Sequence, residues 1–268
     1  MSAQVHSSEV WSAGAAYEPY VGRWSRRVAA AFIAWLNLPV DRRWLDVGCG
    51  TGVLTREILH QATPAAVVGL DPSDGFLGYA RAHTPDGRVV FQSGDAQRLP
   101  YQDGEFDAVV SGLVLNFVPR PEQALAEMKR VLRAGGTAAV YVWDYAGEMQ
   151  MMRRFWDAAA TLDARAVELD EGRRFPICKP ETLVALFPAC GFVQTESRTF
   201  DVPTVFENFD DYWTPFLGGQ GPAPTYVCAL SPTQRDALCE RLRATLPTES
   251  DGSIRLTARA LAVRGQRS

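Results

Sequence analysis

The stretch Trp44-Leu45-Asp46-Val47-Gly48-Cys49-Gly50-Thr51-Gly52 decides the fold. It begins with the apolar residues of a buried strand, continues with an acid, and ends in three glycines spaced two residues apart. Glycines in this pattern form a loop whose bare backbone a ligand can touch. We therefore expect a nucleotide-like ligand to bind at the end of this strand.

Short apolar runs alternate with helical patterns after this loop. The strands are predicted at residues 44–45, 66–70, 88–92, 106–111 and 137–143. This alternation predicts an α/β fold with a doubly wound, mostly parallel sheet and helices on both faces. Between the fourth and fifth strands, a helical pattern begins at Pro121 and is predicted to stop at Gly135-Gly136.

The rest of the chain is interpreted as additions to one domain of 268 residues, 47% of them hydrophobic. Two stretches, rich in helical pattern or in aromatic and turn residues, are interpreted as insertions that cap the sheet's ligand edge. The assigned parts are an N-terminal helical lid at residues 1–41, a ligand-binding core at 42–143, insertions at 144–179 and 201–252, and further sheet elements at 180–200 and 253–265.

Composition limits the kind of partner. The chain has 27 basic and 31 acidic residues and a net charge of −4, so we expect a small-molecule partner rather than nucleic acid. Five cysteines without a CxxC pair and three scattered histidines predict neither a disulfide framework nor a metal site. The longest apolar run, residues 28–36, is shorter than the roughly 20 residues of a membrane span, so we expect a cytoplasmic protein.

An acid follows each of the first three strands. Asp46 would repel a pyrophosphate but suits an ammonium group, such as that of S-adenosylmethionine. Asp71 ends the second strand, where a carboxylate can accept hydrogen bonds from both hydroxyls of a ribose. Asp95, with the backbone N–H of Ala96, follows the third strand, where one acceptor and one donor can recognise an adenine edge. Each acid alone could be a helix cap or turn residue, but their joint order predicts a site for one nucleoside ligand.

Several segments closely resemble class I S-adenosylmethionine-dependent methyltransferases, nearest to the small-molecule enzymes of ubiquinone and menaquinone biosynthesis. They are residues 46–52, 69–73, 94–96 with Leu99-Pro100, 127–136, and the upstream residues 20–25. The resemblance covers residues 42–144 and implies a Rossmann-like sheet whose last strand, residues 254–263, is antiparallel to its neighbours. It also implies S-adenosylmethionine as the cofactor and transfer of its methyl group to a small-molecule acceptor by in-line displacement.

The resemblance also assigns roles to individual residues. It implies that Gly48 and Gly50 let the backbone approach the methionine moiety, while Asp46 holds the amino group of that moiety. Asp71 is implied to bind the ribose. The other residues implied to bind the cofactor are Tyr20, Arg23, Pro72, Phe76, Asp95, Ala96 and Ser111. For Tyr20, Arg23, Phe76 and Ser111, a place in the core or on the surface is the open alternative.

The acceptor side is less defined by the sequence. Asp144, directly after the fifth strand, is the candidate catalytic base, although it could equally cap the helix that follows. The candidate acceptor-binding residues are all aromatic: Trp143, Tyr145, Trp213, Phe216 and Tyr226. Aromatic residues in an insertion can instead be buried against the body of the protein.

Two alternative functions stay open at this point. An NAD-dependent oxidoreductase on a similar fold would need a third glycine in the loop, and Val53 stands at that position. A catalytically silent protein could keep the cofactor pocket without any turnover. The lack of a catalytic triad does not argue against methyl transfer, because alignment and the exclusion of water can accelerate that reaction.

Overall fold

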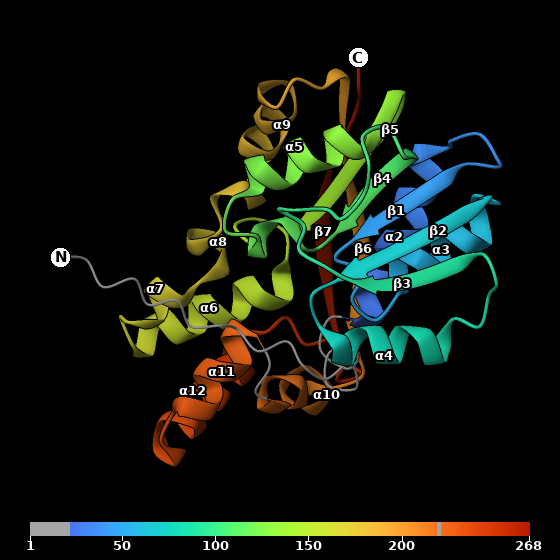
Figure 1. Cartoon of the computed structure of the whole chain (residues 1–268). Helices are drawn as coiled ribbons and strands as arrows, with labels where there is room; N and C mark the ends of the chain where they lie inside the picture. Colours follow the sequence, from blue (N-terminus) through green and yellow to red (C-terminus); the bar gives the residue numbers. More distant parts are fainter. Residues whose placement is uncertain (1–21, 219–220) are drawn as a thin grey trace.

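Seven strands form one sheet in the computed structural model, which describes residues 22–218 and 221–268 (Figure 1). The strands are β1 (Arg43–Val47), β2 (Ala66–Asp71), β3 (Val89–Ser93), β4 (Phe106–Gly112), β5 (Leu132–Trp143), β6 (Val193–Phe206) and β7 (Ile254–Gln266). Their order across the sheet is β3-β2-β1-β4-β5-β7-β6. β1 to β5 run parallel, and β7 is antiparallel to both β5 and β6. The predicted doubly wound, mostly parallel sheet with an antiparallel last strand is therefore confirmed.

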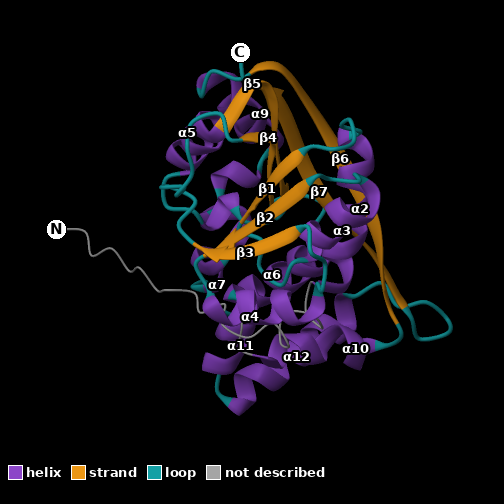
Figure 2. Cartoon of the chain, turned by 45° about the vertical axis from the view of Figure 1, so that its right-hand side comes forward, coloured by secondary structure: helices purple, strands orange, loops and turns teal. Residues whose placement is uncertain are grey.

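Helices cover both faces of this sheet (Figure 2). α2 (Arg23–Leu36) and α3 (Val53–Gln61) pack against each other on one face, and α5 (Pro121–Val131) and α9 (Pro180–Ala189) lie on the other. α4 (Asp74–His83) packs against β2 and β3. α2 shows why these segments become helices: Val28, Phe32 and Leu36 recur at four-residue spacing and form one buried stripe.

A further group of helices lies beyond the edge where the parallel strands end (Figure 1). These helices are α6 (Gln150–Leu162), α7 (Ala166–Leu169), α8 (Glu171–Arg174), α10 (Phe209–Trp213), α11 (Pro222–Ala229) and α12 (Pro232–Thr245). We call them the helical cap, and we call this edge of the sheet the carboxyl edge. α6 packs against α11 and α12, and the rings of Phe155 and Phe216 stack with their centroids 4.5 Å apart. Short 3-10 turns lie at Leu115–Phe117, Pro176–Cys178 and Thr214–Gly218.

Strand pairing explains why both predicted insertions lie at the carboxyl edge. β5 ends there, so the segment that follows it, with α6 to α8, starts at this edge. β6 is parallel to β5, since both are antiparallel to β7, and its last residue Phe206 pairs with Ile254 at the start of β7. Residues 207–253 therefore leave the sheet and return to it at the carboxyl edge.

Two predicted boundaries were wrong because distant strands pair with the segments concerned. α5 already ends at Val131, and Gly135-Gly136 lies inside β5, where the backbone N–H of Gly135 donates to the carbonyl of Arg267 at 2.8 Å. β6 continues to Phe206 instead of ending at residue 200, because β7 pairs with its whole length. The second insertion thus begins after residue 206. The local sequence does not indicate which distant strand will pair with a segment.

Candidate active site

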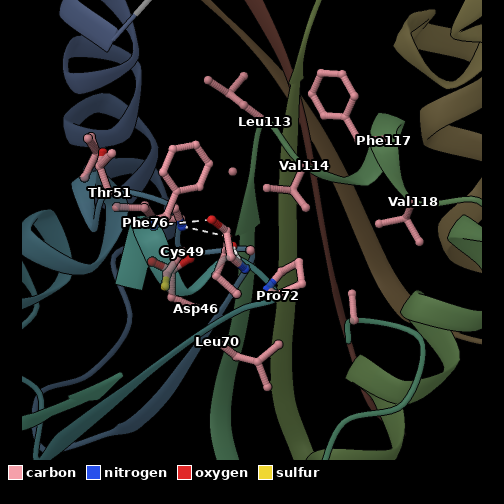
Figure 3. A pocket seen from close by; sticks show the side chains of 18 of the residues that line it. Asp46, Cys49, Thr51, Leu70, Pro72, Phe76, Leu113, Val114, Phe117 and Val118 are labelled. Atoms are coloured by element: carbon pink, nitrogen blue, oxygen red, sulfur yellow. Dashed lines mark hydrogen bonds between the residues drawn. The ribbon is translucent and has the colours of Figure 1, made fainter. Parts of the chain in front are cut away.

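A cavity of about 390 Å³ opens at the carboxyl edge, where ligands bind in open α/β sheets (Figure 3). Its wall is built from the ends of β1 and β2 with the loops that follow them, from the loops after β3 and β4, and from the end of β5. Part of α2 also reaches the wall through Ser25. The strand ends that the sequence singled out therefore meet around one space.

The glycine loop after β1 takes a shape that only glycine adopts without strain. Gly48, Gly50 and Gly52 have φ angles of +74°, +51° and +82°. The backbone N–H groups of Gly48 and Cys49 both donate to the carbonyl of Leu70, at 2.6 and 3.0 Å. A side chain on Gly48 would lie 2.5 Å from Val114, whereas one on Gly50 would meet no atom within 4 Å. Gly48 therefore permits close packing, and Gly50 leaves room in the cavity.

Asp46 carries an unsatisfied acceptor on the cavity wall. Its side chain is fully buried, and its Oδ2 accepts a hydrogen bond of 2.6 Å from the Thr55 hydroxyl. Oδ1 has no partner among the described residues. Burial raises the pKa of Asp46 to about 7; the nearby charge of Asp71 also raises it, while the Thr55 hydroxyl lowers it. A buried acceptor without a partner is costly, so the site fits a ligand that brings a cationic donor.

Asp71 is held rigidly at the end of β2. Its Oδ2 accepts from the backbone N–H of Gly50 at 3.0 Å, and its Oδ1 accepts from that of Ser73 at 2.9 Å. Burial raises the pKa of Asp71, and the hydrogen bonds from Ser73 and Gly50 oppose that rise. Each carboxylate oxygen has a second acceptor direction, so Asp71 can accept two further hydroxyl groups.

The ends of β2 and β3 supply the rest of this side of the cavity. Ser73 caps α4 by accepting a hydrogen bond from the backbone N–H of Phe76, which places the Phe76 ring on the wall beside Pro72. Asp95 and Ala96 line the wall after β3, and Asp95 accepts from the backbone N–H of Gln97 at 2.8 Å. Acids and a ring thus surround the space where the sequence predicted a nucleoside.

The opposite side of the cavity is apolar, and sequence reasoning missed most of it. Leu113, Val114, Phe117 and Val118 come from the loop after β4 and lie together on one side of the cavity (Figure 3). Leu113 has a φ of +61°, held by its backbone N–H donating to the carbonyl of Tyr141 at 2.8 Å. A non-glycine residue in this region costs about 1–2 kcal/mol, and such strain gathers at functional sites. The only sequence signal for these apolar residues is their position directly after a predicted parallel strand.

The cavity brings together most of the predicted site residues. Those on its wall are Asp46, Gly48, Gly50, Asp71, Pro72, Phe76, Asp95, Ala96, Trp143 and Tyr145. Tyr20 lies outside the described residues. The remaining predicted residues do not belong to the described part of the wall: Arg23, Ser111, Asp144, Trp213, Phe216 and Tyr226.

Three of these residues hold the scaffold. Ser111 is buried and donates to the carbonyl of Val47 at 2.8 Å, which ties β4 to β1. Arg23 pairs with Asp211 of α10 at 3.1 Å. Asp144 accepts from the backbone N–H groups of Gly147 and Glu148, at 3.0 and 3.1 Å, so its carboxylate closes a turn instead of facing the cavity as a base.

The three aromatic residues predicted from the second insertion lie in the helical cap or directly beside it: Trp213 in α10, Phe216 in the 3-10 turn that follows, and Tyr226 in α11. The ring of Phe216 stacks on that of Phe155. The ring centroids of Trp213 and Phe216 are 6.1 Å apart, and those of Tyr226 and Trp156 are 5.6 Å apart. All three are buried, and none of them belongs to the described wall of the cavity. The alternative of burial against the protein body describes them.

Comparison with known proteins agrees with this geometry. Residues 45–140 match the family model described as a methyltransferase domain. These residues form a methyltransferase domain. The chain is 37% identical over 123 residues to the ubiquinone/menaquinone biosynthesis C-methyltransferase UbiE of Geobacter sulfurreducens, a match that covers 44% of this chain and 46% of that protein. The resemblance to class I methyltransferases found in the sequence is confirmed.

Solved structures share the fold of the methyltransferase domain and its additions. A protein of Bacillus halodurans C-125 has a TM-score of 0.61 at 16% identity, covering 89% of this chain and 98% of its own. Phosphoethanolamine N-methyltransferase 2 of Haemonchus contortus, in complex with S-adenosyl-L-methionine, has a TM-score of 0.57 at 17% identity, covering 90% of this chain and 53% of its own. The first curated relatives are matched over 28–58% of their own lengths.

The described ranges also lack two features. Within residues 22–218 and 221–268, no three His, Cys, Asp or Glu side chains gather in a way that could hold a metal ion. No helix in those ranges has the length and apolar character needed to cross a membrane.

Proposed function

We propose that this chain is an S-adenosylmethionine-dependent methyltransferase that transfers a methyl group to a small-molecule acceptor by in-line displacement. One observation carries the proposal: Asp46 Oδ1, buried and without a partner among the described residues, lines the same cavity as the fixed carboxylate of Asp71. An ammonium group and a ribose diol, both present in S-adenosylmethionine, match these two acceptors.

The residues on the wall fit the cofactor part by part. Asp46 would hold the amino group, and the open space beside Gly50 would receive the methionine moiety. Asp71 would accept the ribose hydroxyls, each of its oxygens keeping its backbone donor as well. Asp95, Ala96 and Phe76 would enclose the adenine. The proposal thus follows the order of three strand ends.

The chain itself contributes to the reaction by aligning the two reactants and by excluding water. When bound, S-adenosylmethionine supplies a methyl group on a positively charged sulfur that a nucleophile can attack directly. Leu113, Val114 and Phe117 line the cavity with apolar surface, which excludes water from the acceptor. The rigid loop held by Leu70 and Asp71 fixes the cofactor side, so that the two reactants can be brought into line. No residue is assigned as a base, because Asp144 closes a turn.

A dinucleotide fits this wall less well. A pyrophosphate bound at the start of α3 would lie beside Asp46 and Asp71, and like charges in a partly buried site repel strongly. The relative from Geobacter sulfurreducens is named a C-methyltransferase of ubiquinone and menaquinone biosynthesis, which supports a small-molecule acceptor. We therefore retain methyl transfer to a small molecule and propose no hydride transfer.

Calorimetric titration tests the proposal. We expect S-adenosylmethionine and S-adenosylhomocysteine to bind at micromolar concentration and NAD not to bind. Loss of two hydrogen bonds to a carboxylate, about 1.5–3 kcal/mol each, predicts that Asp71→Ala weakens S-adenosylhomocysteine binding at least 100-fold.

Asp74→Ala is the matched control, because Asp74 is exposed in the first turn of α4 and does not belong to the described wall. It should leave the affinity within about twofold, and thermal unfolding of both variants should show a folded protein. Tight binding of NAD, or equal affinity in both variants, would contradict the proposal.

A further inference from the structure

We infer that the methyl acceptor is an uncharged molecule with an aromatic ring, bound between the loop after β4 and the end of β5. This inference rests on the proposed function, since it assigns the other side of the cavity to the cofactor. It names the chemistry of the acceptor, which neither the fold nor the family match determines.

Charge is unevenly distributed around the cavity. Its acidic side chains are all on the cofactor side: Asp46 lies near the end of β1, Asp71 ends β2, and Asp95 follows β3. Among the described residues of the wall there is no lysine, arginine or histidine. An anionic acceptor would therefore find no basic side chain on the described wall to pair with, which disfavours it.

Two arginines of the helical cap, Arg153 and Arg174, do not change this balance. Arg153 donates to both carboxylate oxygens of Asp170, at 3.0 and 2.7 Å, and to the carbonyl of Tyr145. Arg174 is exposed, and its guanidinium lies over the ring of Phe175 at 5.3 Å. Neither belongs to the described wall of the cavity.

The acceptor side instead offers rings and aliphatic groups. Phe117 meets Phe175 edge to face with centroids 5.3 Å apart, and Tyr145 lies 6.1 Å from Phe175. These three rings join the loop after β4, the end of β5 and the helical cap into one aromatic corner. Trp143 lines the cavity beside Tyr145, and Figure 3 shows Phe117 in the same group as Val114. Edge and face positions left on such rings suit a further aromatic ring.

A cationic acceptor is the strongest competitor, because aromatic faces attract ammonium groups. The apolar surface of Leu113, Val114 and Val118 argues against it, since this side would desolvate the charge without replacing its hydration. The acids that could balance such a charge are those assigned to the cofactor. An uncharged ring packs against the apolar surface and needs no charged side chain as a partner.

Three probes of one shape and different charge test the inference: naphthalene-1-methanol, 1-naphthoate and 1-naphthylmethylammonium. Each is titrated calorimetrically into the complete chain saturated with S-adenosylhomocysteine. We expect the neutral alcohol to bind at least tenfold more tightly than either ion. Phe117→Ala should weaken the alcohol at least fivefold, while affinity for S-adenosylhomocysteine stays within about threefold.

Tyr79→Ala is the control, because Tyr79 stacks on His83 of α4 and does not line the described wall. It should leave all three affinities unchanged. Equal or tighter binding of either ion would overturn the inference, and so would a failure of all three probes to bind at millimolar concentration. Failure of S-adenosylhomocysteine itself to bind would refute the proposed function instead, so the two outcomes are distinguishable.

Discussion

Two glycines of one loop should fail in different ways when each is replaced by alanine. Gly48 and Gly50 both have positive φ angles, so an alanine at either position adopts a left-handed conformation. The added Cβ at residue 48 would lie 2.5 Å from both methyl carbons of Val114. At residue 50 it would meet nothing within 4 Å and would project into the space that we assign to the cofactor.

The structure sets the size of each effect. The left-handed conformation costs about 1–2 kcal/mol for a residue with a side chain, and this applies to both variants. Overpacking a filled site adds about 1–3 kcal/mol, and this applies to Gly48→Ala alone. Gly48→Ala should therefore be less stable than Gly50→Ala by about 1–3 kcal/mol. Gly50→Ala should lose at least tenfold in affinity for S-adenosylhomocysteine, since its Cβ occupies ligand space.

A double-mutant cycle isolates the contact with Val114. Urea unfolding followed by tryptophan fluorescence gives the stability of Gly48→Ala, Val114→Ala and the double variant, with Gly50→Ala as the matched control. We expect the double variant to be more stable than the sum of the single changes by about 1–3 kcal/mol, because truncating Val114 removes the clash. Equal stability of the two glycine variants, or strict additivity in the cycle, would refute the packing argument.

Three further predictions concern single side chains. Because burial raises the pKa of Asp46 to about 7, the folded protein keeps a proton that the unfolded chain loses, so the free energy of unfolding without ligand should rise as the pH falls from 8 to 5, while S-adenosylmethionine binding weakens. Asp46→Asn should remove both trends, and parallel pH profiles in the two proteins would contradict this prediction. Ser111→Ala should lower the free energy of unfolding by about 1 kcal/mol and leave cofactor affinity within twofold, because Ser111 bonds to Val47. A large loss of affinity would instead support the predicted contact of Ser111 with the cofactor. Arg153→Met should lower the free energy of unfolding by about 2–3 kcal/mol, because it leaves the mostly buried carboxylate of Asp170 unpaired, and it should weaken binding of the neutral naphthalene probe, because the carbonyl of Tyr145 loses its donor. Arg154→Gln, at an exposed neighbouring position, is the control in urea unfolding and calorimetry.

The cofactor side of the cavity could be predicted because its chemistry is local. The acids at the ends of β1 and β2 and after β3 each stand close behind a short apolar run, and parallel strands bring their ends to one edge whatever the rest of the chain does. Spacing alone therefore predicted that Asp46, Asp71 and Asp95 lie around one cavity. The antiparallel last strand came from the family resemblance, since periodicity carries no strand direction.

The acceptor side could not be predicted, because it depends on contacts between distant segments. Phe117 and Phe175 are 58 positions apart in the chain numbering and meet only because the helical cap folds onto the loop after β4. Asp144 has the residue type of a base and stands after a strand, yet two backbone N–H groups three and four positions later engage it. The aromatic residues at 213, 216 and 226 looked like pocket residues by composition, but the cap uses them as its own core. Side-chain type did not distinguish these uses.

A crystal structure of the chain with S-adenosylhomocysteine tests the central claim most directly. We predict that the ligand occupies the cavity at the carboxyl edge, with its amino group donating to the Oδ1 of Asp46 and its ribose hydroxyls donating to Asp71. A ligand bound elsewhere, or one bound in the cavity that leaves Asp46 Oδ1 without a donor, would contradict the account.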